Sequence, residues 1–298
     1  MSDFRLKVFR SVAKNLSFTK ASQELFVSQP AITKHIQELE AAYQTRLFDR
    51  QGSRISLTES GNLLLEHCER ILEDYKRLEY EMHLLHNEYT GGLKLGASTT
   101  IAQYVLPPLL ASFIGKFPQV SLSLLNGNSR EIEAALQEHR IDLGFVEGVF
   151  RLPNIRYTTF LEDELVAVVR TGSKLAVGEE ITPDELFHLP LVLRERGSGT
   201  LDVFERALQQ HNIKLSSLQV LMYLGSTESI KLFLEHTYCL GIVSVRSITR
   251  ELYSGQLRVV EIKGMPMLRD FSFAQPQGQE SGLAQVFMQF AMHNNHKL

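Results

Sequence analysis

The sequence predicts an α/β protein with an N-terminal winged helix-turn-helix, a long linker helix and a larger C-terminal part. Two short helical patterns lie close together between residues 18 and 40. Residues 58–89 contain no proline and repeat apolar residues at helical spacing. Beyond residue 91, strand-like runs alternate with helical segments. Because 298 residues with 44% hydrophobic content can bury more than one core, we expect two or three domains.

Composition limits the compartment and the cofactors. The two cysteines, Cys68 and Cys239, lie far apart and provide neither a disulfide framework nor a four-ligand metal site. The N-terminus lacks an apolar signal region, and no run of about 18 apolar residues occurs anywhere. We therefore expect a soluble cytoplasmic protein with no membrane segment, no metal and no cofactor.

The charge is unevenly distributed. The net charge of the whole chain is -3, but residues 1–57 hold nine Lys/Arg against five Asp/Glu. Residues 58–90 hold three against eight, so the basic excess lies wholly in the first segment. A local positive field attracts a phosphate backbone, although an ordinary solvated surface would also explain so small an excess.

The first segment predicts three short helices. Asp3 is a candidate cap for the first helix, whose inner face is Leu6, Phe9 and Ala13. The second helix is expected to begin near Ser17 or Thr19 and to bury Ala21 and Leu25.

The third helix has two distinct faces. Pro30 suits its first turn and Ser28 or Gln29 its cap, while the buried stripe is expected to be Ile32, Ile36, Leu39 and Tyr43. The opposite face is polar, as in a helix that reads the DNA major groove, though a plain helical hairpin is the commoner alternative. The predicted DNA-binding residues of this helix are Gln29, Pro30, Thr33, Lys34 and Gln37.

A basic hairpin follows. Arg50 and Arg54 flank Gln51-Gly52-Ser53, a turn between two short apolar pieces. This predicts a wing whose two arginines reach phosphates. Three helices with a basic wing form a winged helix-turn-helix, predicted to span residues 1–57.

These residues also carry a family resemblance. The run FTKASQELFVSQPAITKHIQELEAAYQTRLFDR, followed by RISLTESG, resembles the N-terminal signature of LysR-type transcriptional regulators. Lys34 stands where arginine is common in that family, and Ser60 where alanine is common. The resemblance implies a transcriptional regulator that binds a pseudo-palindromic operator in double-stranded DNA.

Residues 58–90 predict a linker and dimerisation helix, with Thr58 as its cap. Charged residues crowd its other faces, so pairing with a second chain would bury its single apolar stripe; packing on its own domain is the alternative. The residues leave the strand direction open, and the resemblance implies antiparallel pairing. We interpret Cys68 as a small core residue rather than a redox switch. The predicted seam, with alternating steps of four and three, is Leu64, Cys68, Ile71, Tyr75, Leu78, Met82, Leu85 and Tyr89.

The C-terminal part, residues 91–298, predicts mainly parallel sheets. The expected strands cover residues 93–98, 120–126, 141–148, 164–170, 189–195, 218–224, 240–245 and 257–262. The expected helices cover residues 103–117, 130–139, 201–211, 228–236 and 281–293.

Hydroxyl groups gather where these strands end and helices begin. Such positions bind small anions through side chains and free backbone N–H groups, and RERGSGT adds arginine nearby. Helix capping is the alternative role for each hydroxyl taken alone. GAS, DLGFVEG, RERGSGT and LGIVS also follow the order seen in LysR-type regulators.

That resemblance implies two Rossmann-like halves, as in periplasmic solute-binding proteins, with a small-molecule effector between them. The halves are expected at about 91–163 plus 266–298, and at about 164–265. Glu147 would face a cationic group of the effector or pair with arginine. A dimer, assembled into a tetramer, is the implied working unit. The predicted effector residues are Ser98, Thr99, Thr100, Glu147, Ser198, Thr200 and Thr227.

Two other functions are disfavoured. A solute-binding receptor would need a signal peptide, and an enzyme would need a catalytic constellation. No H-E-x-x-H, G-x-S-x-G or C-x-x-C motif occurs. We therefore expect a regulator rather than an enzyme.

Overall fold

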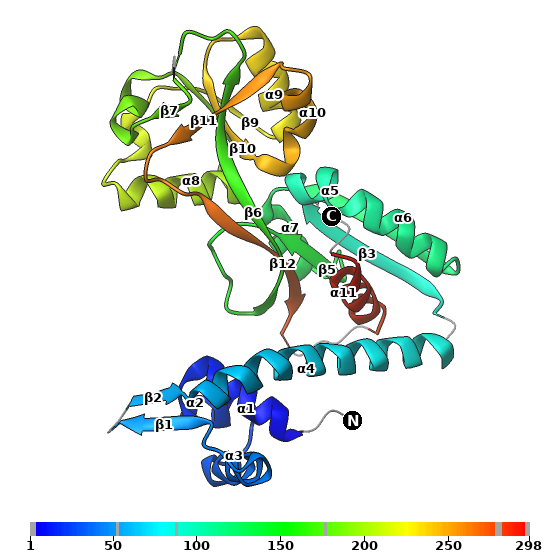
Figure 1. Ribbon diagram of the computed structural model, residues 1–298. Helices are drawn as coiled ribbons and strands as arrows, with labels where there is room; N and C mark the ends of the chain where they lie inside the picture. Colours follow the sequence, from blue (N-terminus) through cyan, green and yellow to red (C-terminus); the bar gives the residue numbers. More distant parts are fainter. Residues whose placement is uncertain (1–3, 52–53, 87–88, 176–177, 278–281, 296–298) are drawn as a thin grey trace. The chain divides into compact units, whose positions relative to one another are not determined.

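The computed structural model describes residues 4–51, 54–86, 89–175, 178–277 and 282–295. The chain divides into two compact units, residues 1–87 and 88–298, whose elements are labelled in Figure 1. In the described part of the chain, no helix is both long enough and apolar enough to cross a membrane.

The first unit contains three short helices, a two-stranded hairpin and one long helix. Ser17 and Ser28 cap α2 and α3, because their hydroxyls accept the N–H groups of Lys20 and Ala31. The predicted cap of α1, Asp3, lies outside the described residues. The elements are α1 (Phe4–Asn15), α2 (Phe18–Glu24), α3 (Gln29–Tyr43), β1 (Phe48–Gln51), β2 (Arg54–Leu57) and α4 (Glu59–His86).

The buried faces of the three helices meet in one core. Phe9, Ala21 and Ile32 are fully buried there, and Leu47 and Phe48 close the core from the start of the hairpin. Tyr43, expected in the buried stripe, is 55% exposed. It is the last residue of α3, and the chain turns away at Gln44 in the left-handed conformation, so Leu47 reaches the core in its place.

The hairpin is antiparallel, with Arg50 opposite Ile55 and Gln51 opposite Arg54. Gly52 and Ser53 of the predicted turn lie outside the described residues. The structure describes the backbone of Arg50 and Arg54 but not their side chains, so their phosphate contacts stay a prediction.

The long helix α4 starts after Thr58, whose hydroxyl accepts the N–H of Gly61 at 2.9 Å. Cys68 lies in the core of the unit, where its Sγ donates to the carbonyl of Leu6. Burial raises the pKa of this thiol to about 11, which keeps it protonated and unreactive. The helix ends at His86, so Tyr89 does not continue the predicted seam. Tyr89 belongs to the second unit, where its ring packs against the ring of Phe117.

The second unit has two halves that share strand β6. The first half has strand order β4-β3-β5-β12-β6, with β3 parallel to β4 and β5. Its elements are β3 (Gly91–Ser98), α5 (Thr99–Tyr104), α6 (Leu106–Lys116), β4 (Val120–Gly127), α7 (Ser129–Gln137), β5 (Leu143–Val146), β12 (Leu268–Pro276) and α11 (Gly282–Asn294).

The second half has strand order β6-β10-β8-β9, and β8 is parallel to both β9 and β10. Strand β11 pairs with β6 on one side and β7 on the other. The elements are β6 (Ile155–Arg170), β7 (Glu180–Ile181), η1 (Pro183–His188), β8 (Leu191–Arg194), α8 (Gly199–Gln210), η2 (Leu215–Ser217), β9 (Val220–Leu224), α9 (Thr227–His236), β10 (Leu240–Ser244), η3 (Val245–Ser247), α10 (Thr249–Tyr253) and β11 (Leu257–Ile262).

Strands β6 and β12 run antiparallel between the halves (Figure 1). Sequence patterns predicted only residues 164–170 of β6 and none of β12. The helix expected over 103–117 is two helices, α5 and α6, which meet at Val105. Pro107 lies in the first turn of α6, where its missing N–H is harmless, but it could not have sat inside one continuous helix.

The backbones of the two halves come into contact where α8 begins. A Cβ placed on Gly199 would lie 2.3 Å from the carbonyl oxygen of Glu147. Gly148, with φ of 111°, faces Gly199 across the same contact. Glycine is therefore required at 199 for the backbones of the two halves to meet.

Gly199→Ala is expected to lower the free energy of unfolding by about 1 to 3 kcal/mol, because backbone atoms of Glu147 cannot rotate out of the way. Gly225→Ala is the matched control, since nothing lies within 4 Å of a Cβ there. That control should stay within about 0.5 kcal/mol of the wild type. Urea unfolding followed by far-ultraviolet circular dichroism measures both, since the chain contains no tryptophan. Equal effects of the two substitutions would contradict the argument.

Candidate functional site

Three helix starts supply the hydroxyl groups predicted to bind an effector. Ser98–Thr100 lead from β3 into α5, Ser198–Thr200 enter α8, and Thr227 begins α9. Every predicted effector residue is buried. Ser198 caps α8 by accepting the N–H of Leu201 at 3.1 Å, as the alternative role of helix capping foresaw. Ser98 makes no such cap bond.

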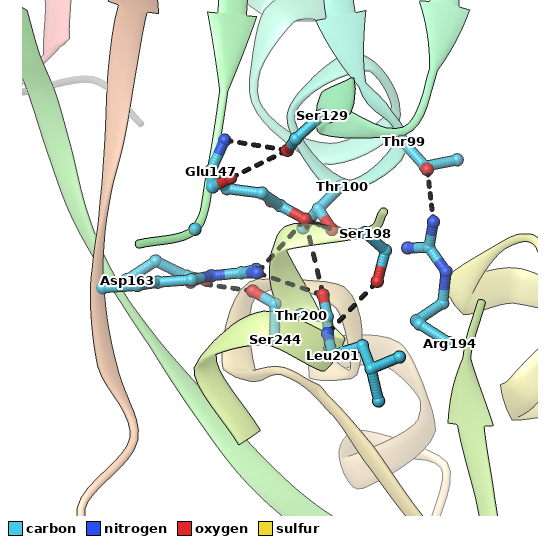
Figure 2. A network of polar contacts seen from close by, with 12 residues as sticks. Thr99, Thr100, Ser129, Glu147, Asp163, Arg194, Ser198, Thr200, Leu201 and Ser244 are labelled. Atoms are coloured by element: carbon cyan, nitrogen blue, oxygen red, sulfur yellow. Dashed lines mark hydrogen bonds and ion pairs between the residues drawn. The ribbon is translucent and has the colours of Figure 1, made fainter. Parts of the chain in front are cut away.

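Glu147 lies at the centre of a polar network between the halves (Figure 2). Thr100 of α5 and Thr200 of α8 both donate to its Oε1, at 3.3 and 3.4 Å. Ser129 fixes its backbone, donating to the carbonyl and accepting from the N–H. One carboxylate thus joins side chains from the two halves.

Arg269 of β12 neutralises this carboxylate. Its Nη1 lies 3.1 Å from Oε1 of Glu147 and donates to the hydroxyl of Thr200 at 3.0 Å. Asp163 is its direct cross-strand neighbour on β6 and accepts from its Nε at 2.7 Å. Ser244, at the end of β10, donates to the other oxygen of Asp163 at 2.7 Å. Buried charges are tolerated when they are paired and hydrogen-bonded in this way.

Arg194, the last residue of β8, reaches the first half from the opposite side. Its Nη2 donates to the hydroxyl of Thr99 at 2.8 Å, and its Nε pairs with Glu195 at 2.8 Å. In Figure 2, one of the guanidinium nitrogens without a dashed line lies on the side of Ser198. The guanidinium is almost completely buried although arginine is rarely so.

Four buried polar atoms of this region have no hydrogen-bond partner among the described residues. They are Ser98 Oγ, Glu147 Oε2, Arg194 Nη1 and Arg269 Nη2. Native proteins leave few buried polar atoms unpaired, because each costs about 1 to 3 kcal/mol. Their concentration around one network is therefore a feature of a ligand site.

A cavity of about 350 Å³ adjoins the network beside strands β6 and β12. Arg269 and Asp163 line it together with Gly148, next to Glu147. Arg151 and Arg206 add further positive charge, while Glu162 and Asp270 add negative charge. The described residues contain no group of three or more histidine, cysteine or acidic side chains that could hold a metal ion.

A second polar contact joins the halves at the start of α9. Tyr104 of α5 donates a hydrogen bond to Glu228, which also pairs with Lys231 at 2.7 Å. Burial and this hydrogen bond raise the pKa of Tyr104 well above its ordinary value. Burial alone would raise the pKa of Glu228, but the bonds from Lys231 and Tyr104 hold it below its ordinary value. The contact is thus an ionised carboxylate facing a neutral phenol.

The candidate nucleic-acid surface lies on α3 of the first unit. Gln29, Pro30, Lys34 and Gln37 are exposed, and Thr33 is partly exposed. The hydroxyl of Thr33 donates to the carbonyl of Gln29 at 3.1 Å, so its oxygen can still accept a bond from a base.

Sequence reasoning missed Arg269 and Asp163. Both lie on strand segments that the patterns did not predict, so nothing placed them near the hydroxyl clusters. Arg194 was noted only as an arginine close to the helix start. The sequence offered one signal for them. Asp163 and Arg269 are opposite charges within runs of alternating apolar residues, and such charges often pair across neighbouring strands.

Comparison with known proteins identifies both units. Residues 4–62 match the model described as "Bacterial regulatory helix-turn-helix protein, lysR family", and residues 86–295 match "LysR substrate binding domain". The uncharacterized HTH-type transcriptional regulator YeiE of Escherichia coli K12 is 35% identical over 258 residues, which cover 87% of this chain and 85% of that protein.

A second curated regulator and a solved regulatory domain are also similar to this chain. The RuBisCO operon transcriptional regulator of Acidithiobacillus ferrooxidans is 30% identical over 287 residues, covering 96% of this chain and 92% of that protein. The solved regulatory domain of Synechocystis CcmR, in complex with 2-PG, is 28% identical with a TM-score of 0.62, covering 68% of this chain and 97% of that one. The chain belongs to the LysR family of bacterial transcriptional regulators.

Proposed function

We propose that this regulator reads DNA with α3, pairs with a second copy through α4 and is controlled by a small anion held between the two halves of the C-terminal unit. The observation that carries the proposal is the buried network around Glu147, with unpaired polar atoms at helix starts from both halves. The corresponding functional segments are residues 1–57 for DNA binding, 58–90 for pairing and 91–298 for effector binding. Because the protein acts on the chromosome, we place it in the cytoplasm.

DNA reading is supported by the two faces of α3. Ile32, Ile36 and Leu39 hold the helix on the core, so its polar side chains are presented from a fixed platform. Amide and hydroxyl groups at this spacing can read base edges in the major groove, and Lys34 can hold phosphate or guanine.

Thr33→Ala is expected to cost about 1 to 3 kcal/mol on the cognate operator and to relax the base preference at one position. A randomised-site selection measures both effects. Lys14→Ala on α1 is the control: it removes a charge from an exposed ion pair with Glu69 and should leave the preferred sequence unchanged. An unchanged preference in the Thr33 variant would count against α3 as the reading helix.

Pairing through α4 is supported by the exposure of the predicted seam residues that follow Cys68. Leu64 and Cys68 are partly or fully covered within their own unit, but Ile71, Leu78 and Met82 are 40%, 52% and 47% exposed. Tyr75 is half-buried, and the side chain of Leu85 lies outside the described residues. A second copy would cover these apolar residues, and two DNA-binding heads suit a two-fold symmetric operator. The resemblance to LysR-type regulators also supports the assembly of such dimers into a tetramer.

Ile71→Asp combined with Leu78→Asp is expected to yield monomers or aggregates, because both changes would bury unpaired charge in the seam. Light scattering of the full chain measures the mass. Leu63→Asp is the control, since Leu63 is 60% exposed and lies off the stripe, and this variant should keep the mass of the wild type. If the double variant remains a dimer of undiminished affinity, the seam is elsewhere.

Control by an anion is supported by polar side chains that arrive from both halves. Thr99 and Thr100 belong to one half, while Arg194, Ser198 and Thr200 belong to the other. A ligand held between them would favour one relative orientation of the halves, and that preference is the free energy available to shift the DNA-binding heads. The small ligand bound by the related domain of CcmR supports the same role for this unit.

Ser98→Ala is expected to leave stability without ligand unchanged, since Ser98 Oγ has no partner among the described residues to lose. It should weaken binding of hydrogen phosphate, used as an anion probe, by about ten-fold. Thermal shift titrations measure both. Thr182→Ala removes the hydroxyl that donates to Glu185 at 2.9 Å in η1, and it should lower stability without altering the response to the probe. Wild-type response in the Ser98 variant would move the anion away from this helix start.

A solute-binding receptor or an enzyme remains the second candidate for the C-terminal fold. The relatives are named as transcriptional regulators. The helix-turn-helix unit favours a regulator over both, because neither alternative has a use for it.

A further inference from the structure

The unpaired atoms of the network differ in kind. Arg194 Nη1 and Arg269 Nη2 are donors that need an acceptor. Glu147 Oε2 is an oxygen of a buried carboxyl group, on a residue only 3% exposed. The hydroxyl of Ser98 can either donate or accept a hydrogen bond. A ligand that satisfies all four must offer both acceptor and donor atoms.

The bonding of Glu147 indicates that its free oxygen is an acceptor. Three donors converge on Oε1: the hydroxyls of Thr100 and Thr200, and the guanidinium of Arg269. A carboxylate accepts in this way and has no proton to give from its second oxygen. The partner of Oε2 must therefore bring a hydrogen.

The guanidinium groups decide the charge of the ligand. A cationic group facing Glu147 would satisfy Oε2 but would leave Arg194 Nη1 and Arg269 Nη2 unpaired beside a second positive charge. An anion without any hydrogen-bond donor would satisfy both arginines but would bring an oxygen lone pair against Oε2. A small anion that carries one hydrogen-bond donor fits both requirements.

We propose that the effector is a small oxyanion that retains one hydrogen-bond donor, either an acid proton or a hydroxyl group, and that Glu147 selects it by accepting this hydrogen. The proposal rests on the proposed function, because it names the ligand class of the same site. Glu147 is then a specificity-determining residue. The arginines bind the negative oxygens, and Glu147 rejects anions that have no hydrogen to offer.

The test compares matched anions on the full-length protein. In mildly alkaline buffer, hydrogen phosphate and sulfate are tetrahedral anions of similar size and charge, but only hydrogen phosphate carries a proton. Glycolate and propionate have the same number of heavy atoms, and only glycolate carries a hydroxyl. Calorimetric titration should give affinities about ten- to hundred-fold higher for at least one donor-bearing anion than for its matched partner.

Glu147→Gln makes the test specific. The amide can donate to a fully ionised anion, so this variant should lose the preference for the donor-bearing member and bind sulfate or propionate at least as well. Glu133→Gln is the matched control, a buried glutamate on α7 that accepts from Tyr157 outside the network. The amide oxygen of glutamine can still accept from Tyr157, so the wild-type preference should persist.

The outcomes separate the two proposals. If sulfate and propionate bind the wild type as tightly as their matched partners, the donor requirement is wrong while the anion site stands. If Glu147→Gln keeps the wild-type preference, Glu147 is not the selecting group. If none of the four anions binds the wild type, the site does not take small oxyanions, and the anionic effector falls together with this inference.

Discussion

The contact between Glu147 and Arg269 is the constraint on which the C-terminal unit depends. Two opposite charges, 3.1 Å apart and nearly inaccessible to water, must compensate each other, because either one alone would be strongly unfavourable. Glu147 directly follows strand β5 of one half, and Arg269 belongs to a strand that crosses between the halves. Thr200 bonds to both and brings in α8 from the second half. The relative orientation of the halves is therefore tied to the satisfaction of one ion pair.

This arrangement explains how a small ligand can act at a distance. A ligand that bonds to Arg194, Glu147 and Arg269 changes which polar groups are satisfied without needing a large contact surface. Because the donors come from both halves, the gain depends on how the halves are oriented. The close approach of Gly199 to the backbone of Glu147 restricts the range of relative orientations that the halves can adopt. Coupling of about 1 to 3 kcal/mol is typical of such switches and is sufficient to alter DNA contacts.

The N-terminal unit was largely predictable from sequence, because its contacts are local. Ser17 and Ser28 precede their helices directly, and the apolar spacing of α1 and α3 gives their inner faces. The exceptions lie at element ends. Tyr43 is exposed because the chain reverses at Gln44, and Tyr89 leaves the seam because α4 ends at His86. Periodicity indicates which face a residue shares, but the end of a helix depends on what the next segment packs against.

In the C-terminal unit, the sequence by itself determined the alternation of strands and helices and the hydroxyl clusters at helix starts. It could not tell which hydroxyls serve as caps: Ser198 does, and Ser98 does not. It also left the partner of Glu147 open. Only the tertiary structure decided that Arg269 fills that role, since the two residues are brought together by the pairing of β12 with β5 and β6. Local patterns carry no information on such pairing, because a buried ion pair is specified by two distant segments and by the solvent they jointly exclude.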